Sequence, residues 1–117
     1  MDYEGHWLYK EICSMSREFR YSIRHMPVEY RYEIGRDIRA ILRELKYKAY
    51  KAIKFSSILS CQDKDILIDL LNKLKIWVDE CLEDKLLLVT GKYTIIQPRK
   101  RLKELLERLG TTGSSQQ

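Results

Sequence analysis

An arginine and a histidine stand five positions apart in "RYSIRH", at Arg20 and His25. An arginine can hold a phosphate and a histidine can transfer protons near neutral pH, so the pair could support RNA cleavage. His25 also lies two residues before Pro27, where we expect a helix to end, and a histidine there complements the negative end of the helix dipole. The pair therefore has a catalytic and a structural interpretation.

The Arg20-x4-His25 spacing resembles the R-x4-H signature of the HEPN ribonucleases, which are helical bundles. Other catalytic chemistry is sparse. Two histidines do not provide a His-rich zinc site, and five glycines scattered singly form no phosphate-binding loop. We therefore predict a protein that is not an enzyme and that has no catalytic residues, metal or cofactor. HEPN-like cleavage remains an alternative.

Positive side chains recur along residues 33–54, "EIGRDIRAILRELKYKAYKAIK". At about 100° per residue, one band of this helix is apolar and faces the core: Ile34, Ile38, Ile41, Leu45, Ala49 and Ala52. The same spacing predicts a second band on the far side: Arg36, Arg39, Arg43, Lys46, Tyr50 and Lys54. Like charges one turn apart repel slightly. Solubility alone does not require that they share one band of the helix. We interpret the second band as a surface for an anionic partner, although a solvated charged face is the alternative.

A second basic cluster opens the last predicted helix, and we assign it to nucleic-acid binding as well: Arg99, Lys100, Arg101 and Lys103. Cations are disfavoured near a helix N-terminus, so this placement favours a binding role. Five tyrosines lie on or beside basic segments: Tyr30, Tyr32, Tyr47, Tyr50 and Tyr93. Tyrosine can stack on a base, and it equally suits a protein interface. The sequence leaves both possibilities open.

The 117 residues carry a net charge of +5 that is unevenly distributed. Residues 1–56 and 87–117 each sum to +4, and residues 57–86 sum to −3. This layout suits binding of RNA or DNA, or docking between the basic stripe and the acidic segment of a neighbouring copy. Three widely spaced cysteines favour a reducing cytoplasm over a disulfide framework. No apolar run approaches the roughly 20 residues that cross a bilayer, and the first residues do not resemble a signal peptide.

The hydrophobic spacing predicts four helices. The first covers residues 3–24, and the second runs unbroken from Pro27 to a connection at residues 56–60. The third begins at Ser60, whose spacing to Asp63 resembles a capping box, and continues through residues 86–89 to a stop at Thr90 and Gly91. The fourth begins near Gln97 because of Pro98 and ends at Gly110. We expect an all-α, antiparallel up-down four-helix bundle over residues 1–110 and a disordered tail over residues 111–117.

Two segments resemble a known bacterial family. Residues 26–54, "MPVEYRYEIGRDIRAILRELKYKAYKAIK", resemble the second helix of the accessory variability determinant (Avd) proteins of diversity-generating retroelements. Small proteins encoded by intervening sequences in large-subunit ribosomal RNA genes are relatives in this family. Residues 92–110, "KYTIIQPRKRLKELLERLG", resemble its last helix, and the likeness covers about residues 6–110. The chain departs from the family at Pro98 and at "TTGSSQQ", which replaces an expected aromatic segment.

The resemblance implies a homopentameric barrel of four-helix bundles. In the Avd branch this assembly binds a reverse transcriptase and its template RNA, and it supports mutagenic cDNA synthesis without catalysing it. The resemblance therefore implies an accessory protein whose partners are a reverse transcriptase, RNA or DNA, and other copies of itself. The intervening-sequence branch implies the alternative of a structural, self-assembling bundle.

Overall fold

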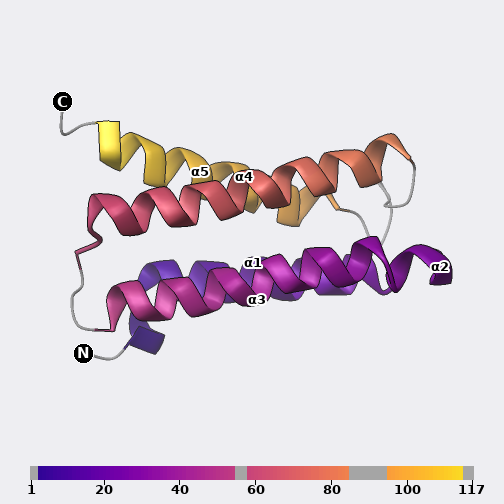
Figure 1. Cartoon of the computed structure of the whole chain (residues 1–117), viewed down its shortest axis with the longest axis horizontal. Helices are drawn as coiled ribbons and strands as arrows, with labels where there is room; N and C mark the ends of the chain where they lie inside the picture. Colours follow the sequence, from indigo (N-terminus) through magenta and orange to yellow (C-terminus); the bar gives the residue numbers. More distant parts are fainter. Residues whose placement is uncertain (1–2, 55–57, 85–94, 115–117) are drawn as a thin grey trace.

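The computed structural model describes the backbone of residues 3–54, 58–84 and 95–114, and the side chains of these segments through Gly110. The described residues form helices without strands: a 3-10 turn η1 (Tyr3–Gly5), α1 (Trp7–Ile23), α2 (Val28–Arg31), α3 (Ile34–Ile53), α4 (Cys61–Glu83) and α5 (Ile96–Ser114). The four long helices pack antiparallel to one another along the chain (Figure 1). The prediction of an all-α bundle is confirmed at this level.

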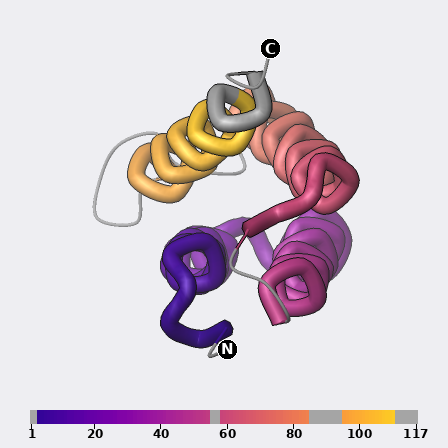
Figure 2. Tube along the Cα trace, turned by 90° about the vertical axis from the view of Figure 1, so that its left-hand side faces the viewer, coloured from indigo at the N-terminus to yellow at the C-terminus, as the bar shows by residue number. Residues whose placement is uncertain are grey.

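Each long helix packs against its neighbours in sequence, and α5 returns to pack against α1. Viewed end-on, the helices occupy four corners in the order α1, α3, α4, α5 (Figure 2). The two helices with the strongest predicted basic character, α3 and α5, are therefore diagonal to each other. The two helices that pack against α3 along its length are α4 and α1.

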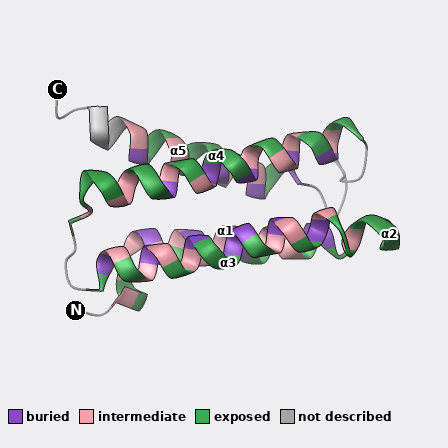
Figure 3. Ribbon diagram, in the orientation of Figure 1, coloured by how far each residue is buried: buried purple, intermediate pink, exposed green. Residues whose placement is uncertain are grey.

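The core lies along the axis between the four helices, where buried residues recur on the inner side of each one (Figure 3). The α1 contribution follows the predicted spacing: Leu8, Ile12, Met15, Phe19 and Ile23, each fully buried. On α4, Leu67, Leu71, Leu74, Val78 and Cys81 have the same role. Burial, reinforced by the neighbouring carboxylates Glu80 and Asp84, raises the pKa of the Cys81 thiol to about 11. Cys81 therefore stays protonated at neutral pH and acts as a core residue.

Local capping explains where α1 and α4 begin. The Nδ1 atom of His6 accepts a hydrogen bond of 3.1 Å from the Leu8 amide. The Ser60 hydroxyl accepts one of 3.0 Å from the Asp63 amide, which confirms the predicted start of that helix. The predicted stop at Thr90 and Gly91 lies outside the described residues, as do residues 86–89, and α4 ends at Glu83.

The prediction of one unbroken helix from Pro27 was wrong, because the backbone turns at Tyr32 and Glu33 between α2 and α3. No proline or glycine marks this break. A tertiary contact stabilises it instead: the Arg39 guanidinium donates to the Arg31 carbonyl at 3.4 Å, which satisfies an acceptor that a continuous helix would use. Periodicity alone could not detect such a contact.

The prediction that Gly110 ends the last helix was also wrong, since α5 continues to Ser114. A C-terminal capping glycine adopts the left-handed conformation, and Gly110 does not. The backbone of residues 111–114, expected to be disordered, is therefore helical, and residues 115–117 lie outside the described segments. The predicted start near Gln97 agrees with the structure within one residue, because Pro98 occupies the first turn, where its missing N–H is not needed.

Candidate nucleic-acid interface

The basic stripe of α3 flanks the core face instead of lying opposite to it. Gly35, Leu42 and Ile53 are buried alongside the predicted core residues, whereas Ile34 and Ala52 are only half-buried. These residues shift the centre of the buried face toward the stripe, at about 100° per residue. As a result Arg39, Lys46 and Tyr50 are half-buried, and Lys46 and Tyr50 lie on the side of α3 that faces α1. The predicted far-side position is wrong for these three residues, whereas Arg36, Arg43 and Lys54 are exposed.

The six predicted residues of the stripe have different environments. Arg36 is exposed and lies 3.8 Å from the Asp37 carboxylate, a weak solvated pair. Arg39 supports the break after α2, as described above. The ammonium group of Lys54 lies 5.4 Å from the centre of the Tyr50 ring, within cation–π range. Arg43 and Lys46 make no ion pair with any described carboxylate.

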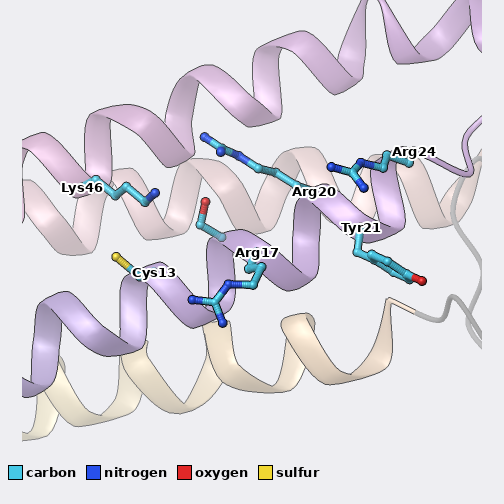
Figure 4. A pocket seen from close by; sticks show the side chains of 7 residues that line it. Cys13, Arg17, Arg20, Tyr21, Arg24 and Lys46 are labelled. Atoms are coloured by element: carbon cyan, nitrogen blue, oxygen red, sulfur yellow. The ribbon is translucent and has the colours of Figure 1, made fainter.

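A cavity of about 350 Å³ opens between α1 and α3. Four cationic side chains line it together with three other residues: Arg17, Arg20, Arg24, Lys46, Cys13, Ser16 and Tyr21. Arg20 extends from α1 and Lys46 from α3 toward the same space (Figure 4). No carboxylate is among the described residues that line it, so the cavity presents concentrated positive charge to a ligand.

A second hollow of about 420 Å³ shares Arg20 and Lys46 with this cavity. Its remaining lining residues are one arginine and four tyrosines: Arg43, Tyr3, Tyr9, Tyr47 and Tyr50. The Tyr3 ring meets the Tyr50 ring edge-on at 4.7 Å between centroids, and Tyr47 stacks beside Tyr50 at 6.4 Å. We call the cavity and this hollow together the α1–α3 surface. It combines cations that can meet phosphates with rings on which bases can stack.

The predicted cluster on α5 divides into paired and unpaired cations. The Arg101 guanidinium donates to Glu18 at 2.8 Å and to Glu11 at 2.9 Å, which ties α5 to α1. These hydrogen bonds raise the pKa of Arg101 above its usual value. Arg99 similarly donates to the Asp79 carboxylate at 3.2 Å. Two of the four predicted residues are thus held by carboxylates of the same chain.

Lys100 and Lys103 are exposed, and they line a different hollow together with Glu104 and Glu107. That hollow is of mixed charge. Because α5 lies diagonal to α3, the structure does not bring this cluster together with the α3 stripe. The two predicted basic segments do not form one site.

Sequence reasoning missed the contribution of α1 to this surface. Arg17, Arg20 and Arg24 recur at steps of three and four, so one face of α1 carries a basic row of its own. That spacing is visible in the sequence, but we considered Arg20 there only as a partner of His25. His25 is exposed beyond the end of α1 and does not line the cavity that Arg20 lines. Neither the cavity nor the second hollow, both of which Arg20 lines, includes His25 among its described lining residues.

Within the described segments, no three metal-ligating side chains gather as they would around an ion. None of the helices described is long and apolar enough to cross a membrane. The three cysteines are free thiols. No protein-family model matches the chain, and no match was found among curated proteins or solved structures.

Proposed function

We propose that this protein is a non-enzymatic nucleic-acid-binding bundle that acts as the accessory factor of a reverse transcriptase in the reducing cytoplasm. The observation that carries the proposal is the α1–α3 surface, where cations that pair with no described carboxylate lie beside a cluster of tyrosines. Phosphates release counterions when they meet such cations, and bases stack on aromatic rings without regard to sequence. This surface suits a single strand of RNA or DNA.

The resemblance to the Avd proteins supplies the more specific part of the proposal. It names a reverse transcriptase and its template as partners, and a homopentamer as the assembly. The proposed role is to hold template RNA or nascent cDNA near the enzyme during mutagenic synthesis.

Binding of a fluorescent single-stranded oligonucleotide tests the nucleic-acid part. We expect saturable binding, measured by fluorescence anisotropy, and loss of affinity of about tenfold when Tyr50 is replaced by alanine, because one base–ring contact is removed. Ala substitution of Tyr32, an exposed tyrosine outside the α1–α3 surface, is the matched control and should leave affinity unchanged. Equal losses in the two variants would contradict the assignment to this surface.

The partner and assembly are tested separately. We expect a reverse transcriptase of a diversity-generating retroelement to co-purify with this protein when the two are expressed together. Native mass spectrometry should show a pentamer that persists at high salt. Dissociation as salt rises would instead support an assembly in which the basic stripe docks on the acidic α4 of a neighbouring copy.

A further inference from the structure

The cationic cavity of the α1–α3 surface gathers more positive charge than binding to a phosphate backbone requires. Four cations from two helices line it, and no acid is among its described lining residues; Arg20 and Lys46 extend into the space between α1 and α3, whereas Arg17 points toward α5 (Figure 4). The nearby acids of α1 are engaged elsewhere, because Glu11 and Glu18 both accept hydrogen bonds from Arg101 on α5. The positive charge of the cavity is therefore not neutralised by the helix that supplies most of it.

Two buried donors in the lining lack partners. Ser16 is 1% exposed, and neither its hydroxyl nor the Nε of Arg20 makes a hydrogen bond within the part of the chain that is described. A buried polar atom without a partner is costly, and native proteins seldom keep one without a reason. An anion with several oxygens would offset this cost at both atoms.

The tyrosine hollow adjoins the cavity through Arg20 and Lys46, which line both spaces. A ligand whose charged end occupies the cavity would therefore place its next group among Tyr47 and Tyr50. A nucleotide has this composition, since a phosphate is joined through a sugar to a base that can stack.

We propose that the cavity binds the terminal 5′-phosphate of a nucleic-acid strand, with the first base in the tyrosine hollow. This inference rests on the proposed function and adds strand-end recognition to it. A terminal phosphate carries a charge of about −1.5 to −2 at neutral pH and presents three acceptor oxygens, as a phosphorylated side chain does. An internal phosphodiester carries one charge and two such oxygens. A lining with four cations and two unpartnered donors therefore matches the terminal group better.

The test compares two single-stranded oligonucleotides of one sequence, with a 5′-phosphate or a 5′-hydroxyl and a dye at the 3′ end. We expect the full-length protein to bind the phosphorylated strand about tenfold more tightly, since hydrogen bonds to a charged group are stronger than those between neutral groups. Adenosine monophosphate and inorganic phosphate serve as competitors. Both should compete only weakly, because they lack the rest of the strand.

Two uncharged substitutions on α1 locate the preference. Ser16→Ala should reduce the ratio of the two affinities by about threefold or more, because it removes a donor to the phosphate. It should not lower thermal stability, because the hydroxyl has no partner among the described residues. Ser22→Ala is the control: that hydroxyl donates to the Glu18 carbonyl at 3.3 Å and does not line the cavity, so the ratio should be unchanged.

The outcomes separate this inference from the proposed function. Equal affinity of the wild-type protein for the two strands, or an unchanged ratio in Ser16→Ala, would overturn strand-end recognition and leave general nucleic-acid binding intact. Competition by adenosine monophosphate as strong as that of the strand would assign the cavity to a free nucleotide instead. Failure to bind either strand would overturn both proposals.

Discussion

Reversing the charge of Arg20 and Lys46 together, as Arg20→Glu and Lys46→Glu, is expected to weaken oligonucleotide binding by at least about 100-fold. These two residues line both parts of the α1–α3 surface, so each reversal removes an attraction to phosphate and adds a repulsion. Loss of affinity should be similar for RNA and DNA of any sequence, since phosphate contacts carry no base information. Fluorescence anisotropy at low salt measures the effect.

A matched double variant on α5 provides the control. Lys100→Glu with Lys103→Glu changes the net charge by the same amount, but these residues lie on the helix diagonal to α3. We expect a loss of less than about tenfold from the long-range field alone. If the two double variants lose affinity equally, net charge governs binding and the α1–α3 surface has no special role.

Replacing Gly35 with alanine is expected to cost about 1 to 3 kcal/mol of unfolding free energy, in the range for overpacked cores. A Cβ at Gly35 would lie 2.8 Å from the Cγ2 of Ile23, a fully buried branched side chain that cannot swing away. The gain of about 1 kcal/mol that alanine gives a helix interior is smaller here, because Gly35 lies in the first turn of α3, so the overpacking cost dominates. Small domains have only about 5 to 15 kcal/mol of stability, so denaturant unfolding should detect the change easily.

The control for this prediction is Gly110→Ala on α5. Apart from its chain neighbours and the backbone of its own helix, no described atom lies within 4 Å of a Cβ built at Gly110, and the residue does not adopt the left-handed conformation. Alanine there should therefore stabilise the protein by up to about 1 kcal/mol. A stable Gly35→Ala protein would mean that α1 and α3 do not approach closely at this point, and the geometry of the α1–α3 surface would need revision.

The fold was largely predictable because apolar residues recur at helical spacing along this chain, and the structure buries them. The row from Leu8 to Ile23 and the cap at Ser60 each identify a helix from local signals. The break between α2 and α3 was not predictable from periodicity, since the hydrogen bond that accompanies it, from Arg39 to the Arg31 carbonyl, joins residues eight positions apart. Gly110 shows the converse error, because a glycine near the expected end of a helix does not always stop it.

The candidate site was predictable only in part. The α3 stripe contributes Arg43, Lys46 and Tyr50 to the α1–α3 surface, as expected for residues that share one band. Which helix lies beside that band is a property of the packing, so the role of α1 could not follow from the α3 pattern. Likewise, Arg101 looks like any cation in the sequence until the structure shows it bound to Glu11 and Glu18.

Oligonucleotide affinity as a function of salt tests the central claim most directly. The α1–α3 surface carries five cations, so if each neutralises one phosphate charge of a single strand, the affinity of the wild-type protein should fall by about 100-fold between 50 and 200 mM salt. The slope of log affinity against log salt should be shallower in the Arg20→Glu, Lys46→Glu variant, which has lost those contacts. A wild-type affinity that does not change with salt would contradict the account, because cations that meet phosphates must release counterions.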